Sequence, residues 1–327
     1  MHREIIWVTW ENHRRSIVLA EELGAHYCFV KSNEIFIFRH LIKAIKTVKI
    51  IYKNRKGLIV VQNPSRILAA LAAMMKLFFR FPLVVDRHTN FRLGKGITIN
   101  PAIWFVIICS EFSLKIADLT IVTNDFLKKM VERKGGRSLV LHDKVPEIKP
   151  PHKKPNLPAG FNILFVCTYA PDEPYNEVIN AAKHLPNDFH IHITGNYEKA
   201  GIKAASSQIP ANVHLLGFVP IEDYEAYLFY CDIVMVLTSS EWVILCGGYE
   251  AAAVRKPLIT SKTQALYEFF QSNAFYTGHA PESIAEAIKE VSSNIRTYQD
   301  RIHLFLEVET KIWERQWFHF KEAVDAL

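Results

Sequence analysis

CDIVMVLTSSEWVILCGGYEAAAVRKPLITS, residues 231–261, contains a short apolar run, a polar loop, a helix-forming run and a second apolar run. Residues 233–237 and the LIT after the helix have the length and apolar character of buried strands. Gly247 and Gly248 open the helix between them. Glycines let a backbone approach a ligand, and free N–H groups at a helix start bind phosphate. The segment therefore predicts an α/β protein with an anion site, unless Glu250 in the first turn is only an acid that suits the helix dipole.

The segment resembles the donor-site signature of the GT-B glycosyltransferases, especially the retaining family four, with the pattern P-S-x-x-E-G-F-G-x-x-x-x-E-A-x-A-x-G-x-P-V-I. TSSE at residues 238–241 is similar to its start, and EAAAVRKPLI at residues 250–259 is similar to its end. The resemblance implies the fold class α/β, GT-B, with two Rossmann-like domains whose parallel sheets face each other across a cleft. It also implies that Glu250 holds the ribose hydroxyls of a nucleotide sugar and that Gly247 and Gly248 approach its phosphates.

Five further residues are assigned to the donor alongside this resemblance. Glu241 ends the TSSE match, although eight residues separate it from Glu250 where the family has seven. GFV at residues 217–219 is similar to the family's G-F/Y-V turn, which holds the base by main-chain hydrogen bonds, and this implicates Val219. The remaining three are Tyr249 beside Glu250, Thr168 at the first strand end of the second half, and Asn196 after the strand FHIHIT.

The loop after Thr168 departs from the family. It carries Asp172 and Glu173, where GT-B relatives often carry a Lys or Arg for the donor diphosphate. Charge neutralisation of the diphosphate is therefore expected from elsewhere or from backbone N–H groups. Neither G-x-G-x-x-G nor G-x-x-x-x-G-K-[ST] occurs, which disfavours a dinucleotide-binding or P-loop protein.

Length and composition fit a two-domain globular protein. The chain has 327 residues, half of them hydrophobic, which suits two domains with real cores. PEIKPPHKKPNLP at residues 146–158 contains five prolines and is predicted to be a semi-rigid linker. We expect an acceptor-side domain over 1–150 and a nucleotide-sugar domain over 151–327. In GT-B proteins the final helix often returns to the first domain, which implies the same for residues 298–326.

The cysteines and the lengths of the apolar runs indicate the cellular compartment of the protein. The five cysteines are scattered and include no C-x-x-C pair, which argues for a reducing compartment and against a zinc site or disulfide framework. The start of the chain has too short an apolar run for a signal peptide, and no stretch approaches about 18 apolar residues. We expect a cytoplasmic protein with no metal and no cofactor, the nucleotide sugar being a substrate.

Two strand-end loops of the first half carry candidate residues for the acceptor. His13, Arg14 and Arg15 follow the strand predicted at residues 5–9, and arginines before a helix can hold a phosphate. The alternative is solvated charge on a surface loop. Asp86 and His88 follow another buried strand and are placed for acid–base catalysis by either residue. The alternative is that they are structural or merely exposed.

A second resemblance concerns the acceptor. VVQNPS at residues 60–65 and LVVDRHTNF at residues 83–91 are similar to the V-Q-N-P-P and V-I-D-W-H-N segments of the mannosyltransferases that extend lipid-linked chitobiose. This resemblance implies a lipid-linked acceptor that is faced by the loop containing Asp86 and His88.

Charge divides the chain into a basic and an acidic half. Residues 1–155 hold 27 Lys and Arg against 12 Asp and Glu, a net charge of +15, and residues 156–327 have a net charge of −9. Seven of the cations and no acid fall within residues 39–56, where apolar residues recur at helical spacing. Such a helix can lie on an anionic membrane surface. The alternative is a packed helix with a solvated basic face.

Together these patterns predict a glycosyltransferase. It would move a sugar from a UDP- or GDP-sugar to an anionic, lipid-linked or cell-envelope or exopolysaccharide acceptor, as a peripheral protein on the inner face of the membrane. One alternative is a GT-B sugar-nucleotide epimerase, which uses no acceptor. Another is a non-catalytic nucleotide-binding module that kept the fold. A nucleic-acid binder is disfavoured, because the cations are interleaved with aliphatic rather than stacking aromatic residues.

Overall fold

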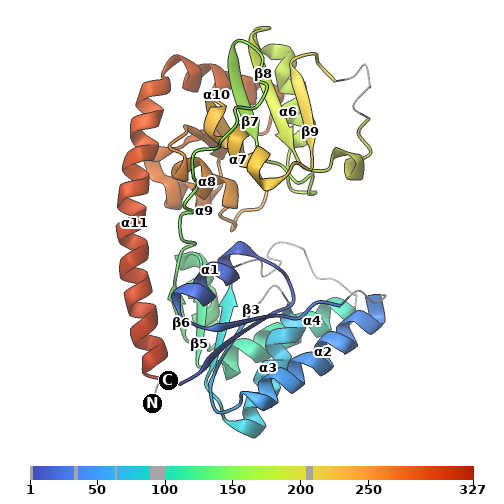
Figure 1. Ribbon diagram of the computed structural model, residues 1–327, viewed down its shortest axis with the longest axis vertical. Coiled ribbons are helices and arrows are strands. Elements are labelled where there is room, and N and C mark those ends of the chain that lie inside the picture. The colour runs from blue at the N-terminus through green and yellow to red at the C-terminus, as the bar shows by residue number, and fades with distance from the viewer. Residues whose placement is uncertain (1–2, 33–35, 63–64, 89–100, 204–208) are drawn as a thin grey trace. The chain divides into compact units, whose positions relative to one another are not determined.

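A computed structural model describes residues 3–32, 36–62, 65–88, 101–203 and 209–327. The chain divides into two compact units (Figure 1). Unit 1 comprises Met1–Lys144 and Ile312–Leu327, and unit 2 comprises Val145–Lys311. Residues 63–64 and 89–91 of the two segments similar to the chitobiose mannosyltransferases lie outside the described residues.

Unit 1 is built on a six-stranded parallel sheet with the order β2-β1-β3-β4-β5-β6. β3 and β4 are buried along their whole length, as expected for parallel strands covered on both faces. The strands are β1 Ile5–Thr9, β2 His26–Phe29, β3 Leu58–Gln62, β4 Leu83–Arg87, β5 Leu119–Val122 and β6 Ser138–Val140. The helices are α1 Arg14–Glu22, α2 Phe36–Lys53, α3 Arg66–Phe79, α4 Pro101–Ile116 and α5 Asp125–Arg133.

Unit 2 contains a second parallel sheet, with the order β12-β11-β10-β7-β8-β9. Its strands are β7 Phe161–Phe165, β8 Phe189–Thr194, β9 Val213–Gly217, β10 Ile233–Val236, β11 Leu258–Ser261 and β12 Phe275–Thr277. Its α-helices are α6 Tyr175–Ala181, α7 Ile221–Tyr230, α8 Cys246–Ala253, α9 Gln264–Phe270 and α10 Pro281–Ser293. Short 3-10 turns occupy Ala182–His184, Tyr197–Ala200 and Gln271–Asn273. The predicted α/β class with two parallel sheets is confirmed.

The strand order fixes where each unit can bind a ligand. In unit 2 the chain runs from β7 to its neighbour β8, but the other neighbour of β7 is β10. In unit 1, β1 lies in the same way between β2 and β3. Open parallel sheets bind ligands at such switch points, at the carboxyl ends of the strands. The residues after β7 and β10, and those after β1 and β3, are therefore the ones that the topology favours.

The last helix, α11 Ile295–Asp325, contributes to both units. Its end supplies Trp313, Phe320 and Val324 to the unit 1 cluster that contains Trp7, and the Trp313 ring stacks on Trp317 at 5.4 Å between centroids. Burial of these large apolar side chains attaches residues 312–327 to unit 1. Residues 146–158 contain neither helix nor strand, as their prolines predict. None of the described helices is both long and apolar enough to cross a membrane.

Candidate functional site

A cavity of about 310 Å³ lies where β7, β8 and β9 end and α7 begins. Its lining is mainly apolar and includes two predicted donor residues, Thr168 and Val219. Phe218 is 90% exposed at the same place. Gly195 also lines the cavity at φ +95°, and a Cβ there would lie 2.3 Å from the Cys167 carbonyl oxygen, so only glycine allows the two loops to approach this closely.

Glu250 is tied to the wall of this cavity by Tyr224. The Tyr224 hydroxyl donates a hydrogen bond of 2.5 Å to Glu250 Oε2, and Tyr224 itself lines the cavity. Glu250 is half-buried in α8. The structure therefore brings Thr168, Val219 and Glu250, which are far apart in the sequence, to one edge of the sheet. Tyr224 was missed by sequence reasoning, because only the register of α7 shows that its hydroxyl reaches Glu250.

The two glycines of α8 have a packing role that the sequence interpretation did not foresee. Both are buried. A Cβ on Gly247 would lie 2.9 Å from Val236 Cγ2, and one on Gly248 would lie 2.6 Å from Phe270 Cζ. Glycine is thus required at both positions for α8 to pack on β10 and α9, whether or not a ligand binds at the first turn of α8. Tyr249 is likewise a core residue, 1% exposed, with its ring 5.1 Å from that of Phe269.

Two other predicted donor residues satisfy local backbone groups. Glu241 is exposed, and its Oε2 accepts a hydrogen bond of 3.1 Å from the N–H of Gln264, the first residue of α9. This geometry suits an acid at a helix start. Asn196 caps the 3-10 turn that follows β8, because its Oδ1 accepts from the N–H of Glu198 at 3.1 Å.

The loops after β7 and β10 are fastened together by Asp172. Its Oδ2 accepts hydrogen bonds from the hydroxyls of Thr238 at 2.7 Å and Ser240 at 2.9 Å, and its carbonyl accepts from the N–H of Ser239 at 2.7 Å. These three residues, TSS at 238–240, begin the segment that resembles the donor signature. In the structure they connect the loops after β7 and β10 at the switch point of the sheet.

In unit 1 the carboxyl end of β4 carries a buried charged cluster. Asp86 is fully buried, and its Oδ1 accepts a hydrogen bond from Arg15 Nε at 2.9 Å. Arg15 Nη1 donates to Asp143 Oδ1 at 2.6 Å. His88 Nδ1 lies 3.3 Å from Asp86 Oδ2. Although burial alone would raise it, the pKa of Asp86 is brought down to about 2 by Arg15 and His88.

Arg15, predicted to face the acceptor, is 3% exposed and paired with two carboxylates. Its charge is thus largely engaged within unit 1, and its acceptor role stays a prediction. Its function in the structure is to fix Asp86. Arg14 is half-buried and donates to the carbonyl of Lys144 at 2.8 Å. The partner Asp143 was not found from the sequence, because it follows β6, distant in sequence from β4.

The two histidines of this region stack. The rings of His13 and His88 lie 4.5 Å apart between centroids, and His13 Nδ1 accepts from the N–H of Arg15 at 3.3 Å as the N-cap of α1. Burial and the neighbouring His88 lower the pKa of His13. His88 is buried as well, and its Nε2 has no hydrogen-bond partner in the part of the chain that the structure describes.

Comparison with known proteins agrees with this geometry. Residues 160–294 match the family model described as Glycosyl transferases group 1, a range that contains the cavity, Tyr224 and Glu250. These residues form a glycosyltransferase domain. No curated protein matches the sequence, and similarity to the chitobiose mannosyltransferases remains a prediction.

Similarity to solved structures shows that the chain has the GT-B fold. Anabaena HepE in complex with UDP and glucose is similar with a TM-score of 0.76 at 14% identity, over 100% of both chains. Sucrose-phosphate synthase from Thermosynechococcus elongatus has a TM-score of 0.74 at 13% identity, over 98% of both chains. A putative UDP-N-acetylglucosamine 2-epimerase from Listeria monocytogenes has a TM-score of 0.65 at 11% identity, over 92% of this chain and 91% of that one.

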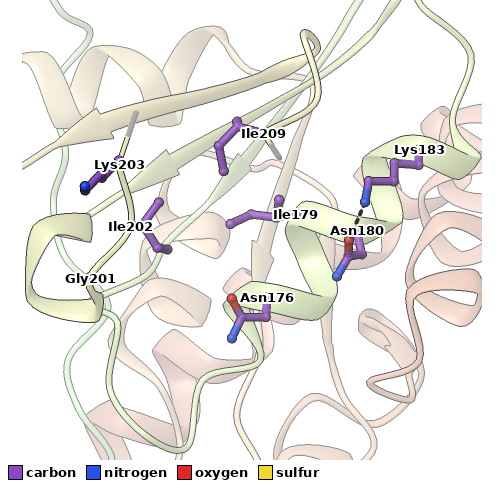
Figure 2. A pocket seen from close by; sticks show the side chains of 8 residues that line it. All are labelled: Asn176, Ile179, Asn180, Lys183, Gly201, Ile202, Lys203 and Ile209. Carbon is purple, nitrogen blue, oxygen red and sulfur yellow. Dashed lines mark hydrogen bonds between the residues drawn. The ribbon is translucent and has the colours of Figure 1, made fainter. Parts of the chain in front are cut away.

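Unit 2 has a second, larger hollow of about 580 Å³ beside α6. Figure 2 shows its lining residues, among them Asn180 and Lys183, whose side chains are hydrogen-bonded at 2.8 Å. Its lining is mainly polar, and it includes none of the predicted donor residues. Thr168 and Val219 line the smaller cavity instead. In the described parts of the chain no group of three or more His, Cys, Asp or Glu is arranged to hold a metal ion.

Proposed function

We propose that the protein transfers a sugar from a UDP-sugar to a lipid-linked or other cell-envelope acceptor at an anionic membrane surface. The observation that carries the donor part is the cavity at the ends of β7 and β8, whose wall reaches Glu250 through Tyr224. A mainly apolar cavity with a few polar groups at its edge is the usual form of a small-molecule site. UDP is preferred to GDP because the HepE structures contain UDP or UDP-glucose.

Each donor residue has a physical role in this proposal. The backbone of Val219 pairs with the base, and the exposed Phe218 ring covers it from the rim. Glu250 accepts hydrogen bonds from the ribose hydroxyls and is oriented by Tyr224. A carboxylate acceptor strengthens these bonds relative to a neutral group.

The acid–base role falls to His88. A carboxylate with a pKa of about 2 is a weak base near neutral pH, so the role of Asp86 is to orient His88 for proton transfer. The acceptor oxygen bonds to the anomeric carbon of the sugar as the sugar–phosphate bond breaks. UDP departs with the electron pair of that bond, and His88 Nε2 takes the proton of the acceptor hydroxyl.

The acceptor part of the proposal rests on an exposed apolar face of unit 1, formed by α2, α3 and α4. These helices lie together in Figure 1. The face consists of Phe38, Leu41, Ile45, Val48 and Tyr52 of α2, Met74, Leu77, Phe78 and Phe79 of α3, and Trp104, Phe105 and Ile108 of α4, all exposed. Large exposed apolar surfaces with charged surroundings mark interaction sites.

The cations of α2 indicate an anionic lipid surface as the partner of this face. Lys46, Lys49 and Lys53 are exposed and alternate with the apolar stripe of α2. Lys43 is engaged elsewhere, since its Nζ donates to the Trp10 carbonyl at 2.9 Å. Ile50 and Ile51 of α2 are not available for insertion, because they pack in the core of unit 1.

We expect vesicles with anionic lipid to carry the protein upward in a flotation gradient, and neutral vesicles to carry much less. Replacing Lys46, Lys49 and Lys53 by Gln should weaken partition about a hundredfold, since each cation near an anionic surface contributes about 1 kcal/mol. The matched control replaces Lys129, Arg133 and Arg137, exposed cations on and after α5, and should float like wild type. Equal flotation on neutral and anionic vesicles would contradict the proposed partner.

The reaction itself is tested by UDP release from UDP-sugars, with and without vesicles that contain a lipid-linked saccharide. We expect release to require the acceptor, beyond slow donor hydrolysis. An epimerase would instead interconvert the nucleotide sugar with no acceptor present, and a non-catalytic module would bind UDP without turnover. Either result would replace the proposed function.

A further inference from the structure

The carboxylate of Glu173 occupies a cradle of hydrogen-bond donors in the loop after β7. Its Oε2 accepts from the backbone N–H of Thr168 at 2.9 Å and of Ala170 at 2.8 Å. The Thr168 hydroxyl lies 3.2 Å from Oε1 and 3.1 Å from Oε2, and the Cys167 thiol lies 3.4 Å from Oε2. Tyr169, between the two N–H donors, has φ +59°. Convergent backbone N–H groups in such a turn form an anion-binding concavity.

This cradle borders the cavity that the donor would occupy, because Cys167 and Thr168 also line it. Within the described residues, neither Glu173 nor its neighbour Asp172 forms an ion pair with a Lys or Arg. The negative charge of Glu173 is therefore held by neutral donors alone. Glu173 is half-exposed, so its side chain can leave the cradle for solvent without repacking a core.

We propose that Glu173 is a built-in competitor of the donor diphosphate. The cradle presents its N–H groups to one anion at a time, and two anions there would repel each other. Binding of a nucleoside diphosphate then requires that the Glu173 carboxylate leave the Thr168 and Ala170 N–H groups. The inference rests on the proposed function, since it assumes that a nucleotide binds in the adjacent cavity.

Competition at the cradle acts on the phosphates and not on the nucleoside. A resident carboxylate therefore weakens UDP binding while leaving uridine binding unchanged, and it favours release of UDP after transfer. A purely structural Glu173 has the opposite signature. Its loss would loosen the loop that also lines the nucleoside cavity, and the affinities for UDP and uridine would fall together.

The test is calorimetric titration of wild type, Glu173→Gln and Glu173→Ala with UDP and with uridine. We expect both variants to bind UDP about tenfold more tightly, the effect of freeing a charge-assisted hydrogen-bonding site, and to bind uridine within twofold of wild type. Glu177→Gln is the matched control. It removes the same charge in the first turn of α6 and should change UDP affinity by less than twofold.

The alternative outcomes separate the two levels of inference. Unchanged or weaker UDP binding by both Glu173 variants, with wild type binding UDP, would overturn the competitor role and leave the donor site in place. If Glu177→Gln raised the affinity for UDP as much as the Glu173 variants do, the competitor role would also be overturned. The gain would then come from removing any one negative charge near the site. Absence of binding of UDP and of uridine to wild type and every variant would overturn the proposed function and this inference together.

Discussion

Replacing His88 by alanine is expected to lower the rate of sugar transfer by about 10²–10⁴, the usual cost of losing a general base. The KM for the nucleotide sugar should stay within about twofold, because His88 belongs to unit 1 and the donor residues to unit 2. The physical reason is the unpartnered Nε2 of a buried imidazole whose Nδ1 lies 3.3 Å from Asp86. Steady-state kinetics with saturating acceptor measures both quantities.

His26→Ala is the control for this experiment. His26 is an exposed histidine of β2 in the same unit, and its loss should leave turnover near the wild-type value. Asp86→Asn is a poorer test of catalysis, because breaking a buried ion pair costs about 3–5 kcal/mol of folding stability. Near-full turnover of a folded His88→Ala protein would place the catalytic base elsewhere.

Replacing Glu250 by glutamine is expected to weaken UDP binding about ten- to hundredfold. A carboxylate that accepts hydrogen bonds from ribose hydroxyls contributes about 1.5–3 kcal/mol, much of which a neutral amide does not supply. Glu250 is half-buried and oriented by a 2.5 Å hydrogen bond from Tyr224, so its position is set before the ligand arrives. Calorimetric titration with UDP measures the change directly.

Glu241→Gln is the matched control, because the same charge is removed from the other acid of the donor signature. Glu241 is exposed and accepts from the first N–H of α9, so its loss should affect UDP binding by less than twofold and stability only slightly. If the folded Glu250→Gln protein binds UDP as wild type does, the ribose is not held at Glu250. If Glu241→Gln has the larger effect, the two acids have exchanged roles.

The sequence by itself determined the α/β class and the edge of each sheet that carries the candidate residues. Apolar runs that alternate with helical patterns produce parallel strands, and parallel strands present their carboxyl ends at one edge. Thr168 and Val219 could therefore be assigned to one side of unit 2, and Asp86 and His88 to the end of a strand in unit 1, before any contact was known. These inferences need only the order of local segments.

Tertiary structure alone decided which side chains are free to act. Arg15 lies in a charged run that is typical of a surface loop, yet its guanidinium is held between Asp86 and Asp143. Gly247 stands at a helix start, where a glycine is expected to approach a phosphate. The structure shows that it is required for packing, because Val236 leaves no room for a Cβ there. Helical spacing predicts that α2 is amphipathic, but only packing shows that Ile51 faces the core while Leu41 faces solvent. Whether a side chain is buried or paired depends on residues that are distant along the chain. A single sequence gives the type of each side chain, but it does not show which side chains lie next to it in space.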